Sequence, residues 1–150
     1  MIENVIGKRY AEALTSSIQD DLRLDSALKN LEDLWGAFRL DLALVSFFEH
    51  PGVQPEKKAS MVNNLCEKAG AEPEVRNLLL TLVERRKILN LKNVLEYFQL
   101  SVDERLKRIR ASVVSASPLG EDQSRRLRLE LGSTIGKEVL IETSVDESLI

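Results

Sequence analysis

Residues that commonly build metal and catalytic sites are scarce in this sequence. Its 150 residues include one cysteine, Cys66, and one histidine, His50. A single cysteine excludes an internal disulfide, and the two residues together supply too few ligands for a structural zinc site. We therefore expect no disulfide and no metal, and a reducing compartment suits this composition best.

Glycine and proline are also scarce, with seven and four residues. Such low counts argue against a loop-rich or disordered chain. The glycines are scattered, and no Gly-Lys-Ser or Gly-Lys-Thr sequence occurs, so a phosphate-binding loop is unsupported. Gly136 is better explained as the end of the preceding helix than as part of a nucleotide site. We expect no cofactor.

A strong net charge and a long hydrophobic run are absent as well. The net charge is only -3 and the pI is near 5.3, so the whole molecule does not attract nucleic acid or anionic lipid. The longest nearly uninterrupted apolar run, Leu78–Val83, is far too short to cross a bilayer. The first ten residues resemble neither a signal peptide nor a transit peptide. Any membrane association is therefore expected to come through a partner.

Hydrophobic periodicity predicts six helices joined by short loops, which together indicate a helical bundle. Proline at a first helical position marks two helix starts, at Pro55 and Pro73, and Asp25 or Ser26 could cap the second helix. The expected segments are Glu3–Gln19, the stripe Leu24–Phe38, the short segment Leu42–Glu49, Pro55–Gly70, a helix from Pro73 through Val83, and the stripe Leu91–Leu106.

After Arg108 the pattern changes to β-branched and alternating residues. Ile109–Ala116 predicts a strand, Glu121–Ile135 a helix and Glu138–Thr143 a second strand. The sequence thus predicts a mainly α protein, with a six-helix N-terminal domain over residues 1–107 and a small α/β domain over residues 108–150. Two strands and one helix are too few to close a core, so we expect this domain to be incomplete and the natural chain to continue.

The sequence contains no evident group of residues that could form a catalytic site. His50 lies beside Pro51 in an expected loop, and Cys66 falls on the apolar side of its helix, so structural roles are favoured for both. Two basic clusters, at residues 85–87 and 105–110, could contact RNA or an acidic partner. Because no aromatic residues alternate with them, solvated helix ends are the favoured interpretation.

The fifth helix is unusual because only Thr81 is polar between Leu78 and Val83. A helix that is apolar nearly all round is either central in a bundle or is covered by a partner. The first helix offers a matching face, on which Ala13 and Ser17 are small enough for another helix to approach closely. One interpretation is therefore a groove between the first and fifth helices that receives an amphipathic helix.

Several stretches resemble one known family. They are Arg-Tyr-Ala-Glu-Ala-Leu at Arg9–Leu14, Phe-Glu-His-Pro-Gly-Val at Phe48–Val53, Asn77–Glu84, and Ala-Ser-Val-Val-Ser-Ala-Ser-Pro-Leu at Ala111–Leu119. Their order and spacing over the whole chain resemble the delta subunit of F-type ATP synthase, whose mitochondrial counterpart is the oligomycin-sensitivity-conferring protein. Two departures are Gly120, where the family usually has a serine or threonine cap, and Arg86-Lys87-Ile88, which replaces an arginine-leucine ending.

The resemblance implies a non-catalytic stator subunit that supports rotary, proton-driven ATP synthesis. Its six-helix domain would bind the N-terminal helix of an alpha subunit of the catalytic head, and its C-terminal domain the C-terminal helices of the b subunits in the peripheral stalk. The protein would lie at the cytoplasmic face of the bacterial inner membrane and touch the membrane only indirectly. The groove residues implied on this chain are Ile6, Tyr10, Ala13, Ser17, Leu78, Thr81, Leu82 and Arg85.

An alternative is a helical RNA-binding module of the transcription antitermination type, whose bundles look similar. The acidic pI and the strand-helix-strand segment argue against it. A small hydrolase or transferase would need a nucleophile and base, and no such pair is evident.

Overall fold

The computed structural model describes residues 4–149 and divides into two compact units. One unit ends at Val102 and the other begins at Asp103, slightly before the boundary that the sequence indicated near residues 106 to 110. Asp103 is also joined to the second unit by its carboxylate, which pairs with Arg108 and Arg110 of the following strand. The last turn of the sixth helix therefore belongs with the second unit.

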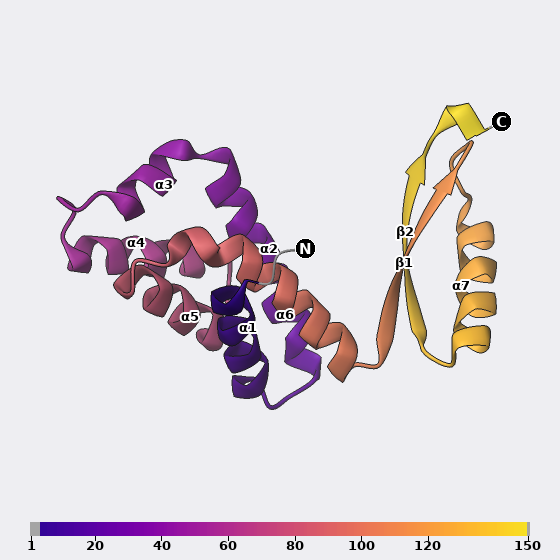
Figure 1. Cartoon of the computed structure of the whole chain (residues 1–150), viewed down its shortest axis with the longest axis horizontal. Coiled ribbons are helices and arrows are strands. Elements are labelled where there is room, and N and C mark those ends of the chain that lie inside the picture. Colours follow the sequence, from indigo (N-terminus) through magenta and orange to yellow (C-terminus); the bar gives the residue numbers. More distant parts are fainter. Residues whose placement is uncertain (1–3, 150) are drawn as a thin grey trace. The chain divides into compact units, whose positions relative to one another are not determined.

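The predicted helical bundle is confirmed, and Figure 1 shows its helices from indigo to orange. Between Asn4 and Arg105 of the described chain there are six α-helices, with a short 3-10 turn at Ile88–Asn90 before the last. Their bounds are α1 Val5–Ser17, α2 Leu22–Leu40, α3 Leu42–Glu49, α4 Pro55–Lys68, α5 Pro73–Glu84 and α6 Leu91–Arg105.

Local sequence signals account for most helix starts. The Asn4 side chain accepts a hydrogen bond from Gly7 N at 2.7 Å, and the Asp41 carboxylate accepts bonds from the first turn of α3. The cap expected at Asp25 or Ser26 is wrong, because α2 already begins at Leu22. There Asp20 Oδ1 accepts from Leu22 N at 2.9 Å and satisfies a donor of the first turn.

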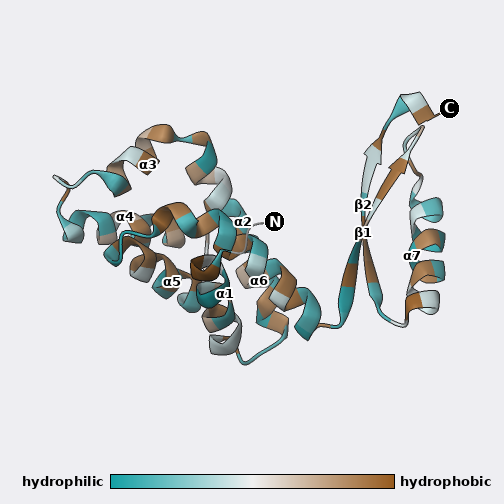
Figure 2. Ribbon diagram, viewed as in Figure 1, coloured by the Kyte–Doolittle hydropathy of each residue, from teal (hydrophilic) through white to brown (hydrophobic). Residues whose placement is uncertain are grey.

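The core of the bundle is formed by the inward faces of its helices, and in Figure 2 the second half of α5 is coloured as strongly hydrophobic. α1 approaches α6 very closely at Gly7, where an added Cβ would lie 2.6 Å from Asn93 Cβ. Large side chains that are fully buried in this unit are Ile18, Leu24, Leu31, Val62, Val75, Leu79, Leu82, Leu91, Val94, Phe98 and Val102.

The second unit is a strand-helix-strand segment, as predicted. β1 (Arg108–Ser115) and β2 (Glu138–Val145) pair in parallel, with Arg108 opposite Glu138, and α7 (Glu121–Ile135) connects them (Figure 1). β1 begins one residue before the expected strand and β2 extends two residues past it. Gly136 ends α7 with a left-handed φ of 74°, as expected for a glycine helix stop.

Two arginines and one aspartate anchor the start of β1. Arg108 Nε lies 2.6 Å from Asp103 Oδ1, and Arg110 Nε lies 2.7 Å from Asp103 Oδ2. Because the side chains of Arg108 and Asp103 are almost completely buried, each charge depends on the other for compensation. Among the described residues, no helix is both long and apolar enough to cross a membrane.

Candidate functional site

A groove of about 270 Å³ runs between α1 and α5. Its α1 side consists of Tyr10, Ala13 and Ser17, which are spaced three and four residues apart and therefore share one helix face. Leu78 and Thr81, also three residues apart, belong to the facing side of α5. The full lining is Tyr10, Ala13, Leu14, Ser17, Glu74, Asn77, Leu78 and Thr81.

The structure places five of the eight residues expected for this groove in its lining, and the other three, Ile6, Leu82 and Arg85, outside it. Leu82 does not line it, because its side chain is 0% exposed in the core. One residue along a helix turns the side chain by about 100°, so Leu82 faces inward where Thr81 faces the groove. Ile6 and Arg85 lie outside the lining, and Arg85 is the exposed residue that follows α5.

Three lining residues were missed by the sequence interpretation: Leu14, Glu74 and Asn77. Leu14 is only 3% exposed and forms part of the floor. Glu74 and Asn77 precede Leu78 and Thr81 by about one turn of α5, so helical spacing could have identified them.

The serine and threonine hydroxyl groups in the groove already have hydrogen-bond acceptors. Ser17 Oγ donates to Leu14 O at 2.7 Å, and Thr81 Oγ1 donates to Asn77 O at 2.8 Å. Both side chains therefore present mainly methylene or methyl surface and an accepting oxygen, and they do not leave unused donors. With Leu14 and Leu78 at the floor, the groove suits the apolar face of another helix.

One end of the groove is fixed by an ion-pair cluster. Arg23 Nη2 lies 2.6 Å from Glu74 Oε2 and 2.6 Å from Glu72 Oε2. The hydrogen bond from Arg23 lowers the pKa of the Glu72 carboxyl, and the bonds to Glu72 and Glu74 raise the pKa of Arg23. All three side chains are partly exposed, so we expect the cluster to hold these side chains in position and to contribute little to the free energy of unfolding.

The other candidate residues have structural explanations. His50 is exposed, and its Nδ1 accepts a hydrogen bond from Gly52 N at 3.0 Å within the loop after α3. Cys66 is completely buried, and this burial raises the pKa of its thiol. Arg108 and Arg110, from the second basic cluster, are engaged with Asp103. In residues 4–149 no group of three potential ligands could hold a metal ion.

The protein-family model described as the ATP synthase delta (OSCP) subunit matches residues 6–150, which is nearly the whole chain. The chain belongs to this family. The resemblance seen in the sequence motifs is thereby confirmed, whereas the RNA-binding alternative receives no support from the match.

Curated relatives agree with the family assignment. ATP synthase subunit delta of Desulfosudis oleivorans is 30% identical over 146 residues, covering 97% of this chain and 80% of the relative. That of Syntrophus aciditrophicus is 31% identical over 153 residues, covering 100% of this chain and 83% of the relative.

A solved structure shares the fold. A chain in the cryo-EM structure of the Toxoplasma gondii mitochondrial ATP synthase hexamer matches with a TM-score of 0.64 and 19% identity. The match covers 95% of this chain and 78% of that chain. The mainly α architecture with a small strand-containing segment is therefore one that occurs in a solved ATP synthase assembly.

Proposed function

We propose that this delta-family protein is a non-catalytic stator subunit of an F-type ATP synthase. Its helical unit would hold the catalytic head, and its strand-containing unit would hold the peripheral stalk. The observation that carries the proposal is the α1–α5 groove, which has an apolar floor and in which the Ser17 and Thr81 hydroxyls already have acceptors. The chain's family and relatives carry the delta-subunit name.

The proposed occupant of the groove is the N-terminal helix of an alpha subunit. An amphipathic helix binds such a groove by placing its apolar residues over small side chains and between larger ones. Ala13 is exposed and has only a methyl group, so a helix can approach α1 closely there. Tyr10 and Leu78 can flank the inserted side chains, and a few such anchors supply most of the binding energy.

The proposed ligand of the second unit is the C-terminal end of the b subunits. α7 has no buried residue, and Leu129 and Ile135 are 66% and 45% exposed. Exposed leucine and isoleucine on a helix provide apolar surface that a stalk helix could cover. The protein would then reach the membrane only through its partners, as a peripheral component at its cytoplasmic face.

The proposed mechanism is mechanical and requires affinity without chemistry. Rotation of the central rotor exerts torque on the catalytic head, and the head would turn with it unless a stator opposed the torque. A subunit with one contact to the head and another to the stalk completes that stator. Because each contact carries mechanical load, each must dissociate slowly. We therefore expect large apolar side chains to contribute most of the binding free energy.

Ala13→Trp tests the groove. A synthetic peptide of the alpha-subunit N-terminus should bind the unmodified chain in isothermal titration calorimetry, and the indole should fill the space that the peptide uses. We expect a loss of about thirtyfold or more in affinity, equivalent to one strong anchor of about 2 kcal/mol. The thermal unfolding midpoint should change little, because Ala13 is exposed.

Glu12→Trp is the matched control, because Glu12 is the exposed neighbour of Ala13 and does not line the groove. This variant should bind the peptide like the unmodified chain. Equal affinities for the two tryptophan variants would remove the groove assignment.

A further inference from the structure

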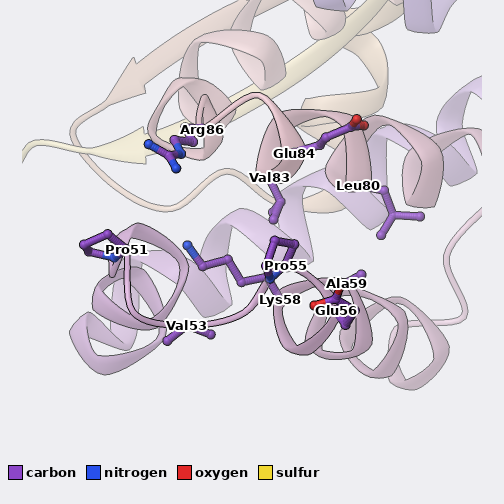
Figure 3. A pocket seen from close by; sticks show the side chains of 10 residues that line it. All are labelled: Pro51, Val53, Pro55, Glu56, Lys58, Ala59, Leu80, Val83, Glu84 and Arg86. Atoms are coloured by element: carbon purple, nitrogen blue, oxygen red, sulfur yellow. The ribbon is translucent and has the colours of Figure 1, made fainter.

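A second and larger pocket lies between α5, α4 and the loop before α4 (Figure 3). Its volume is about 580 Å³, within the range of small-molecule sites. None of its lining residues belongs to the α1–α5 groove. They are Pro51, Val53, Pro55, Glu56, Lys58, Ala59, Leu80, Val83, Glu84 and Arg86.

Lys58 is the most unusual member of this lining. Only 9% of the residue is exposed, yet its ammonium group has no ion-pair or hydrogen-bond partner among the described residues. The other buried basic residue, Arg108, is paired with Asp103. The stem of Lys58 is buried, whereas its Nζ is not among the buried side-chain atoms that lack a partner, so the ammonium group reaches solvent at the pocket. An anion that enters the pocket can therefore pair with Lys58 without displacing another partner.

Arg86 provides a second, independent observation. Its φ of 55° is left-handed, a conformation at helix ends that glycine adopts with less strain than an arginine does. Its guanidinium lines the same pocket and likewise has no partner among the described residues. In Figure 3 the ends of Lys58 and Arg86 lie on the same side of the pocket, toward Pro51. The left-handed residue closes the end of α5, where Arg86 N donates to Val83 O at 3.0 Å and Lys87 N donates to Leu82 O at 2.7 Å, and this turn places the Arg86 side chain at the pocket.

The other residues that line the pocket indicate which chemical group the anion would carry. Val53, Ala59, Leu80 and Val83 offer apolar surface against which a hydrocarbon chain can pack.

Two carboxylates limit the charge of the ligand. Glu56 and Glu84 also border the pocket, and the Glu84 carboxylate points away from Lys58 and Arg86 in Figure 3. They would repel a polyanion such as nucleic acid or polyphosphate, since like charges at close range are unfavourable. A single negative charge at the Lys58 end is therefore favoured.

We propose that this pocket binds an amphiphilic monocarboxylate, such as a medium-chain fatty carboxylate. The carboxylate accepts hydrogen bonds from Lys58 and Arg86, and the hydrocarbon chain lies against Leu80, Val83 and Ala59. Binding at this pocket is independent of the α1–α5 groove and of the stator role.

Titration with octanoate tests the proposal on the full chain, by calorimetry and by amide chemical shifts in NMR spectra. Octanoate should bind in the micromolar to millimolar range and shift residues of the pocket. Lys58→Met keeps the buried stem and removes the charge, so affinity should fall roughly tenfold or more. Lys68→Met, an exposed position on the same helix, should have no effect. Uncharged octanamide should bind at least tenfold more weakly than octanoate.

Further variants separate loss of binding from loss of folding. Lys58→Arg keeps the cation and should retain octanoate binding. Arg86→Gly relieves the left-handed backbone, so it should not destabilise the chain but should weaken octanoate binding. Absence of octanoate binding at 10 mM, or equal binding by Lys58→Met and Lys68→Met, overturns the proposal. So does an acidic segment of a partner subunit that shifts the pocket residues when octanoate does not.

Discussion

Replacing Gly7 by alanine tests how closely α1 must approach α6. Gly7 is a buried residue of α1, and an added Cβ would lie 2.6 Å from Asn93 Cβ and 3.0 Å from the Asn93 carbonyl carbon. Contacts this short require one of the helices to move, because the obstacle includes backbone. Since α1 also forms one side of the groove, the substitution acts on both the stability and the binding surface.

Two opposing effects set the expected magnitude. Alanine is intrinsically favoured over glycine in a helix by about 1 kcal/mol. Overpacking in a close-packed interior costs about 1–3 kcal/mol. With both the Cβ and the backbone of Asn93 in the way, we expect the steric effect to win. The predicted result for Gly7→Ala is a net destabilisation of about 1–2 kcal/mol.

Gly36→Ala is the matched control in α2. An added Cβ at Gly36 would meet no atom within 4 Å, so only the helix propensity changes. This variant should be more stable than the unmodified chain by up to about 1 kcal/mol. Urea unfolding followed by Trp35 fluorescence reports on both variants, because Trp35 lies half-buried in α2 of the same unit.

Opposite signs for the two alanine variants are the critical outcome. If Gly7→Ala stabilises the chain as Gly36→Ala does, the close crossing of α1 and α6 is wrong. A double variant gives a further check, because Asn93→Gly removes the Cβ that lies at 2.6 Å. The measured coupling between Gly7→Ala and Asn93→Gly should then be favourable by roughly 0.5 kcal/mol or more.

The remaining predictions concern the corrected groove residue and the ion-pair cluster. Leu82→Ala should lower the free energy of unfolding by about 2–5 kcal/mol, because a fully buried leucine is truncated. Affinity of the folded variant for the alpha-subunit peptide should be nearly unchanged, and a selective loss of affinity would return Leu82 to the groove. The pKa of Glu72 is lowered in the folded chain by Arg23, so its contribution is present at neutral pH and is lost as pH falls through the folded value. Glu72→Gln should therefore lower the thermal unfolding midpoint at neutral pH and make the midpoint less dependent on pH in the acidic range. An unchanged pH dependence of the midpoint would contradict the ion pair between Glu72 and Arg23.

Elements with local signals were predicted well from the sequence. α7 has the bounds that were expected, because Pro118-Leu119-Gly120 interrupts regular structure before Glu121 and a left-handed Gly136 follows Ile135. Pro55 and Pro73 begin α4 and α5, because proline is favoured at the first position of a helix. The start of α2 was missed, since Asp20 satisfies the first turn from a position that does not fit the usual capping pattern.

The groove was only partly predictable. The α1 face followed from helical spacing, because Tyr10, Ala13 and Ser17 lie in one row. Between Leu78 and Val83 only Thr81 is polar, so spacing within that stretch of α5 could not distinguish the face that lines the groove from the face in the core. The neighbouring helices made that choice, and they buried Leu82 while leaving Thr81 at the groove.

The sequence by itself determined the helices, the change to strands after Arg108 and the family, because these depend on local propensity, hydrophobic spacing and ordered motifs. Only the tertiary structure decided which side of α5 is buried and that Lys58 lies unpaired in a pocket with Arg86. Those facts arise where segments far apart in sequence meet, and burial of a side chain is a property of its neighbours in space.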